Sequence, residues 1–216
     1  MKRFFFITFL FLTTTHFSQE SSVKIFTSDA KNVEIFTEKL DNITIITSNS
    51  EKYEVSLFNE NNNSNNVVID DEKEILKINF KLPTLKNPEG VFRKFITKRL
   101  NRAYGIIKIP KNKTVSIFGT HIDVISKSYK GDISIFIEHG IVRLNLVQKN
   151  AKVNVFQGTV YASVSKANIN IKSNKGTIIV QGKKQVSPYR ISLKNQSKKF
   201  VVNSINANVI LTKVKN

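Results

Sequence analysis

Residues 131–181 read GDISIFIEHGIVRLNLVQKNAKVNVFQGTVYASVSKANINIKSNKGTIIVQ, and short phrases in this stretch alternate apolar with mostly polar residues. The six phrases span residues 132–138, 141–147, 152–156, 159–165, 168–172 and 177–181. An alternation of period two is typical of β-strands with one buried face. The sequence therefore predicts six strands that share one core.

The first inward residues of these phrases follow one another at a mean spacing of nine residues. They are predicted to be Ile133, Val142, Val153, Val160, Ile169 and Ile178. A regular short period of this kind indicates a stack of repeats, none of which can bury a core alone. We expect an all-β, single-domain β-solenoid, β-helix-like, in which the phrases stack without interruption. A twisted β-sandwich fits the same spacing, but few Asn-Gly or Asp-Gly hairpin dipeptides lie between the phrases, which favours the solenoid.

The N-terminus has the features of a secretory signal peptide. Met1-Lys-Arg is followed by an apolar run at residues 4–13, and we predict cleavage after Ser18. A retained N-terminal anchor is the alternative. The sequence has no cysteine, so stability must come from burial and from the sheet. These features indicate a protein exported to the bacterial periplasm or outer cell surface, with no membrane-spanning segment once the signal peptide is removed.

The domain at residues 19–216 is expected to have a less regular N-terminal part (19–103) and a regular stack (104–216). Alternating segments in the first part predict strands at residues 23–26, 33–36, 43–46 and 53–58. The polar run at 59–66 predicts a solvated loop, and residues 67–80 predict a hairpin.

One segment breaks the strand pattern. Residues 91–103 place apolar side chains at helical spacing, which predicts one short helix. Its opposite face is basic and consists of Arg93, Lys94, Lys98, Arg99 and Arg102. A helix that plugs the end of the stack, an irregular or strand segment, and a contact with an anionic membrane or partner all fit these residues.

The phrase Ile107-Lys-Ile-Pro-Lys-Asn-Lys-Thr-Val115, the closing segment 202–211 and the glycine-led phrases resemble a known family. The glycines are Gly131, Gly140, Gly158 and Gly176. The resemblance is to the DUF4097-type putative adhesins, close to auto-transporter adhesin head domains, of Bacteroidetes-like bacteria. It covers about residues 22–213, and it departs from the pattern at Ala207. It implies a β-helical, non-enzymatic domain at the cell envelope and supplies no functional residue.

The net charge of +18 is large. Such a field attracts anionic partners such as lipopolysaccharide, acidic glycan or extracellular DNA. Alternatively, the lysines fill solvent-facing positions and protect strand edges from pairing.

Candidate catalytic and metal-binding residues are few. His121 and Asp123 are two apart and could share one face of a strand, but no third ligand is near in sequence. His139 precedes a predicted corner. The acids of the six phrases are Asp132 and Glu138, which do not form the carboxylate cluster that glycan cleavage needs. No cofactor motif occurs. The sequence favours a non-catalytic adhesin or interaction module, with an electrostatic polymer binder and a glycan-cleaving enzyme as alternatives.

The outward positions of the phrases hold the remaining candidates for a binding surface. They are Phe136, Phe156, Tyr161, Arg143, Lys152 and Lys172, and Phe118 joins them if Val115 and Ile117 point inward. Aromatic faces beside lysines suit sugar rings and anionic polymers. Coverage of these side chains by another segment is the alternative.

Overall fold

The computed structural model of the protein describes residues 21–59, 67–82 and 103–212. The predicted signal peptide lies outside these residues, as do the basic side chains Arg93, Lys94, Lys98, Arg99 and Arg102. Ala103, which helical spacing assigns to that basic segment, instead begins a strand and is buried. The described part of the chain contains no helix that could cross a membrane.

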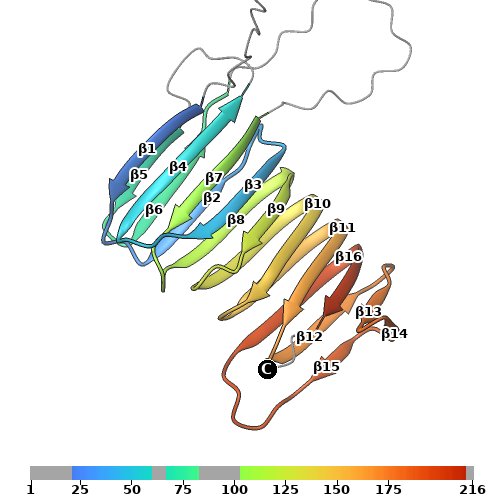
Figure 1. The fold of residues 1–216 in the computed structure, drawn as a ribbon. Helices are drawn as coiled ribbons and strands as arrows, with labels where there is room; N and C mark the ends of the chain where they lie inside the picture. The colour runs from blue at the N-terminus through green and yellow to red at the C-terminus, as the bar shows by residue number, and fades with distance from the viewer. Residues whose placement is uncertain (1–20, 60–66, 83–102, 213–216) are drawn as a thin grey trace, which may run out of the picture.

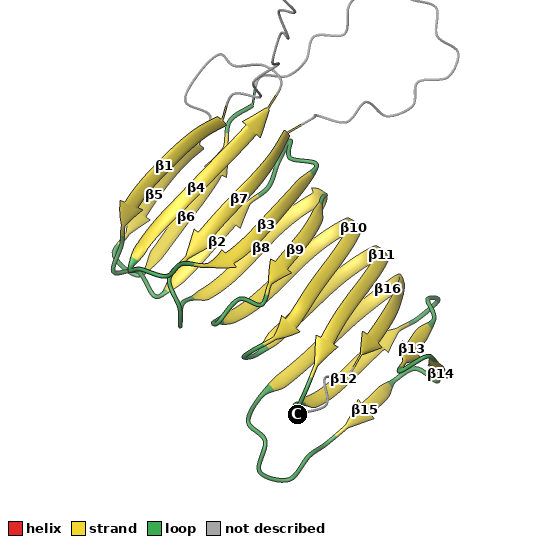
Figure 2. Ribbon diagram, in the orientation of Figure 1, coloured by secondary structure: helices red, strands yellow, loops and turns green. Residues whose placement is uncertain are grey.

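The described residues form sixteen strands, and no helix is drawn among them (Figure 2). The strands are β1 (Ser21–Thr27), β2 (Asn32–Phe36), β3 (Asn42–Thr47), β4 (Lys52–Asn59), β5 (Val67–Glu72), β6 (Ile75–Phe80), β7 (Ala103–Ile109), β8 (Thr114–His121), β9 (Asp123–Lys127), β10 (Asp132–Val147), β11 (Ala151–Val164), β12 (Asn168–Ser173), β13 (Ile178–Val180), β14 (Lys183–Gln185), β15 (Tyr189–Ile191) and β16 (Lys199–Thr212). All belong to one mixed sheet. The all-β prediction is confirmed.

Two of the long strands each contain two of the predicted phrases. The first half of β10 pairs in parallel with β8, and its second half pairs in parallel with β9. The prediction of six separate strands is therefore wrong, because the first four phrases form only β10 and β11. The break that the sequence suggests at Gly140 and Gly158 is a bend within each strand, where these residues have φ of +147° and +146°. Glycine adopts this backbone region readily.

The spatial repeat is twice the predicted spacing. Ile133 pairs with Val115 on one side and with Ala151 on the other, so neighbouring strands are offset by eighteen residues in each direction. Figure 1 shows the result, an elongated stack with β1 and β5 at one end and β14 and β15 at the other.

The expected uninterrupted order of the stack is also wrong. The final long strand, β16, lies between β11 and β12, since Phe200 pairs with both Ala151 and Ile169. The same interleaving occurs near the N-terminus, where β2 lies between β6 and β8. Inserted strands carry the same alternation as their neighbours, so the core continues through them.

Alternation did predict the core. The six predicted inward residues are all buried, with exposed fractions between 0% and 6%. They belong to one hydrophobic cluster that runs from Ala30 to Leu211. The strands that contain the six phrases pair in parallel, either with one another or with β16. Consecutive strands joined by hairpins would instead pair antiparallel.

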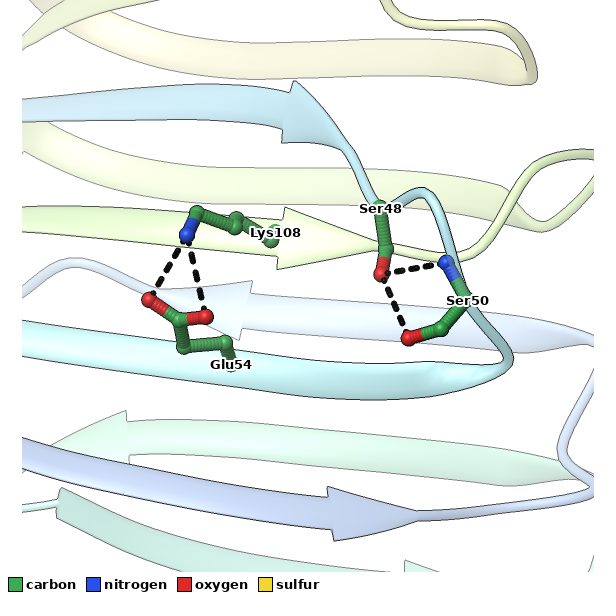
Figure 3. Close-up of polar contacts among 4 residues, drawn as sticks. All are labelled: Ser48, Ser50, Glu54 and Lys108. Atoms are coloured by element: carbon green, nitrogen blue, oxygen red, sulfur yellow. Dashed lines mark hydrogen bonds and ion pairs between the residues drawn. The ribbon is translucent and has the colours of Figure 1, made fainter.

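Antiparallel strand pairs lie at the two ends of the sheet. The predicted hairpin at 67–80 is confirmed, since β5 and β6 pair antiparallel. Antiparallel pairs β1–β4, β12–β15 and β13–β14 complete the ends. In the turn between β3 and β4, Ser50 donates its N–H to the Ser48 hydroxyl at 3.2 Å (Figure 3). On the strands that follow, Lys108 of β7 forms an ion pair with Glu54 of β4 at 2.9 Å.

Candidate functional site

Three phenylalanines form a row across adjacent strands. Phe36 of β2 pairs with Phe118 of β8, which pairs with Phe136 of β10. Because register partners in parallel strands point to the same side, their rings stack, with centroids 5.3 Å and 5.2 Å apart. The row lies on the outer side of the sheet, since its inward neighbours Ile35, Ile117 and Ile135 are fully buried.

Stacking decides which part of each ring is available. The planes of Phe118 and Phe136 lie 9° apart, so their faces cover one another and their edges point away from the row. The amine of Lys152 lies 5.7 Å from the centroid of Phe136. The aromatic faces that the sequence offered to sugar rings are thus largely occupied within the protein. What remains is a strip of apolar ring edges.

Polar side chains continue the same row toward the C-terminal end. Phe136 pairs with Asn154, Asn154 with Asn203, and Asn203 with Lys172. The Asn203 side chain donates its Nδ2–H to Oδ1 of Asn154 at 3.1 Å. The row is therefore apolar on β2, β8 and β10 and polar on β11, β16 and β12.

This row is one side of a groove of about 720 Å³. A second row, two residues further along the chain from each member of the first, forms the other side. The second row consists of Glu38, Thr120, Glu138, Phe156, Asn174 and Ile205. Phe156 is 49% exposed and Ile205 is 42% exposed, and the register of β11 with β16 makes them neighbours in one apolar patch. The groove runs across the strands and is open to solvent.

Gly119 lies on the inward side of β8, below the groove, where there is no room for a side chain. A Cβ at this position would collide with Oγ1 of Thr37 and with Cγ2 of Ile122. The Thr37 hydroxyl donates to the carbonyl of Phe118 at 2.9 Å, which ties the chain beyond β2 to β8. A larger residue at 119 would therefore disturb the contact that holds Phe36 beside Phe118.

Charge is unevenly distributed along the stack. Glu38 and Glu138 lie toward the N-terminal end of the groove, and Lys172 lies at the other end. Fourteen Lys and Arg residues follow Glu138 in the sequence, and no Asp or Glu does. The C-terminal half of the stack is consequently a strongly cationic body.

Two histidines lie beside the groove. The rings of His121 and His139 are 4.6 Å apart, and His139 also stacks on Phe156 with centroids 5.8 Å apart. Asp123, the predicted companion of His121, accepts the N–H of Ile141 at 2.8 Å. Its carboxylate thus has a backbone role, and the described residues contain no group of three metal-ligating side chains.

The structure separates the predicted outward residues into two places. Phe136, Phe156 and Lys172 lie along the groove, with Lys152 beside it. Arg143 and Tyr161 belong to the second halves of β10 and β11, where the guanidinium lies 4.5 Å from the ring centroid. This cation–π pair is apart from the groove, because neither side chain lines it.

Several groove residues were missed from the sequence. Asn154, Asn203 and Ile205 carry no motif, and their places depend on where β16 inserts. Phe36 had a signal that could have found it: Val33-Glu-Ile-Phe36, Val115-Ser-Ile-Phe118 and Ile133-Ser-Ile-Phe136 are variants of one phrase. Each phrase places its phenylalanine at the same position of its strand.

The fold is similar to that of a putative cell adhesion protein from Clostridium sporogenes, with a TM-score of 0.59 at 15% identity over 91% of this chain and 99% of that chain. A putative adhesin from Bacteroides fragilis matches at 10% identity over 91% and 98% of the two chains, with a TM-score of 0.31. A putative lipid binding protein from Parabacteroides distasonis matches at 10% identity over 90% and 97%, with a TM-score of 0.26. No protein-family model and no curated protein matches the sequence. The first of these likenesses supports an adhesin-like fold.

Proposed function

We propose that this protein is an exported, non-catalytic interaction module of the bacterial cell envelope that holds an extended polymer in the groove. The adhesin-like fold and the sequence resemblance to the DUF4097-type family support this assignment. Export rests on the basic and apolar N-terminal residues 1–18, and protease treatment of intact cells would test exposure at the surface.

In this proposal the sheet is a β-solenoid with turns of eighteen residues. The constant offset of eighteen residues between β8, β10 and β11 supports this description. So does the pairing of β10 with β8 through its first half and with β9 through its second half. A solenoid of this kind presents each outward row as a straight line of side chains. The groove is the place where two such lines lie side by side.

The observation that carries the proposal is the pair of exposed apolar side chains, Phe156 and Ile205, which lie beside Asn154 and Asn203 in the same groove as the phenylalanine row. Adjacent strands are about 4.8 Å apart, so the groove from β2 to β12 is about 24 Å long, enough for several units of an extended chain. The amides of Asn154 and Asn203 can exchange hydrogen bonds with hydroxyl or amide groups of the ligand. A glycan has both the apolar ring faces and the hydroxyls that this surface suits.

The acids of the six phrases support a non-catalytic role. Asp132 accepts the N–H of Asn150 at 3.0 Å and so holds a turn, while Glu138 is exposed at the side of the groove. A glycan-cleaving pair needs two carboxylates facing one bond. The groove's second carboxylate is Glu38, and in their row Thr120 of β8 lies between it and Glu138.

Binding to immobilised envelope glycans tests the proposal. Purified protein is titrated against lipopolysaccharide, peptidoglycan and a neutral glucan, and compared with the double variant Phe156→Ala and Ile205→Ser. We expect the double variant to lose at least tenfold in affinity, about 1.4 kcal/mol. The matched control is Ile25→Ser, which removes a side chain that is 62% exposed on β1 and lies outside the groove. Equal binding by the wild type, the double variant and the Ile25→Ser control would refute the groove as the binding site.

A second candidate function follows from the absence of acids after Glu138. We propose as the alternative that the cationic C-terminal half docks electrostatically on lipopolysaccharide phosphates, acidic glycan or extracellular DNA. Affinity for such polymers falls steeply with salt, whereas affinity based on apolar contacts does not. Binding that disappears at high salt, and that is unchanged in the Phe156→Ala and Ile205→Ser double variant, would favour this alternative.

A further inference from the structure

Within residues 21–59, 67–82 and 103–212, the sheet ends in unpaired strand edges on both sides. Among the described residues, β5 pairs only with β6, and β15 pairs only with β12. The companion strands β1 and β14 are likewise paired on one side only. Figure 1 shows β1 with β5, and β14 with β15, at opposite ends of the stack. An unpaired edge offers a row of N–H and C=O groups to another strand.

The hydrophobic core also reaches both ends. Four partly buried apolar side chains pack against it, and they lie on terminal strands at both ends of the stack. Phe26 and Ile69 belong to the N-terminal end, and Tyr189 and Ile191 belong to the C-terminal end. A strand added at either end would complete their burial, as β16 does for its neighbours within the stack.

The two ends carry opposite charges. The edge strand β5 and the turn after it expose Asp70, Asp71, Glu72 and Glu74, which outnumber the exposed Lys73 of that turn and the Lys77 that pairs with Glu72. On the opposite end, β14 exposes Lys183 and Lys184, and Arg190 and Lys194 are exposed on and just after β15.

Strand directions are compatible with end-to-end contact. β6 and β12 point in the same direction, because an unbroken series of parallel pairs connects them. β5 is antiparallel to β6, and β15 is antiparallel to β12, so β5 and β15 also point in the same direction. β15 of one copy and β5 of the next can therefore pair in parallel, as most strands of the sheet do. On each strand the outer residue is charged, Arg190 on β15 and Asp70 on β5, while Ile191 and Ile69 face the core.

We propose that copies of this protein associate head to tail, with the basic β14–β15 end of one copy on the acidic β1–β5 end of the next. The one inward charge on β1, Lys24, donates to the carbonyl of Val67 at 2.5 Å and so bridges the two edge strands. Its amine is thus already satisfied within one copy. The two surfaces differ, so the contact is heterologous and extends into a filament.

This association goes beyond the proposed ligand groove. The groove lies along the middle strands, from β2 to β12, and the end contact leaves it open. A filament would present the groove repeatedly, which raises the avidity for a polymeric ligand without any new contact to it.

Sedimentation velocity with charge-reversed variants tests the proposal. At low salt the weight-average sedimentation coefficient of the purified protein should rise with concentration, and it should fall when salt is added. The variants are Asp70→Lys with Glu74→Lys at one end, and Arg190→Glu with Lys194→Glu at the other. Each alone should sediment as a monomer. An equal mixture of the two should associate again, because each reversed end meets a complementary one.

The control reverses two charges in the middle of the stack, Arg143→Glu with Lys152→Glu, and changes the net charge as much as the basic-end variant does. It should associate like the wild type, and so should the groove variant. Circular dichroism establishes that each variant is folded. A wild type that stays monomeric at every concentration would overturn the proposal. End variants that associate as well as the control, or fail to associate when mixed, would do the same.

Discussion

The bend in β11 depends on a residue without a side chain, and Gly158→Ala tests that dependence. Gly158 has φ of +146°, and a Cβ there would overlap the carbonyl oxygen of Gly140 in the adjacent strand. The backbone conformation costs a non-glycine residue about 1–3 kcal/mol. Forcing a methyl group into packed atoms adds about 1–3 kcal/mol. The expected loss in unfolding free energy is therefore about 2–6 kcal/mol, with no hydrogen bond or charge removed.

Gly182→Ala is the matched control. Gly182 also has a positive φ, +76°, but a Cβ there meets nothing within 4 Å. The control should lose only the unfolding free energy that the backbone conformation costs, about 1–2 kcal/mol. Urea unfolding followed by circular dichroism at 25 °C measures both losses. If Gly158→Ala destabilises the protein no more than Gly182→Ala does, the close approach of β11 to β10 at the bend is wrong.

Three further predictions concern the core and the phenylalanine row. Tyr129→Phe removes a buried hydroxyl that lies within hydrogen-bonding distance of the carbonyl oxygens of Pro110, at 3.1 Å, and Lys113, at 3.0 Å. Urea unfolding should show that the variant loses about 1–2 kcal/mol of unfolding free energy. An unchanged urea midpoint would contradict these hydrogen bonds. Burial raises the pKa of Tyr53 to about 12 and also raises the pKa of Tyr129, while both titrate near 10 when unfolded. These two tyrosines should therefore lower the stability of the fold only above about pH 10. The fall is about 1.4 kcal/mol per pH unit for each tyrosine, and Tyr129→Phe should halve the slope. Phe118→Ala should cost more than Phe36→Ala in the same assay, because the central ring stacks on two neighbours and the end ring on one; equal losses would argue against the row.

Local alternation was enough to predict which residues form the core. In Ile133-Ser-Ile-Phe136 the two isoleucines are buried and the phenylalanine points outward, as period two requires. Strand patterning depends only on near neighbours in sequence, so it survives whatever the strand order is. The outward placement of Phe136, Phe156 and Lys172 followed from the same rule.

Strand order could not be predicted in this way. Phe36 and Phe118 are far apart in sequence, and nothing local says that β2 pairs with β8. The segment at 199–212 alternates like any other, so the sequence placed it at the end of the stack although β16 lies inside it. The groove depends on these long-range pairings, since Asn203 and Ile205 come from the inserted strand. For the same reason the sequence suggested free aromatic faces, where register places the rings against one another.

If the groove across β2, β8, β10, β11, β16 and β12 receives the ligand, the residues that line it must respond when a glycan binds. The most direct measurement is a map of backbone amide chemical shifts as a lipopolysaccharide-derived oligosaccharide is titrated into isotope-labelled protein. We expect changes that follow the groove across the strands, at Phe136, Asn154, Phe156, Asn203 and Ile205, and that persist at high salt. Changes confined to the basic residues of β14 and β15, and abolished by salt, would contradict it.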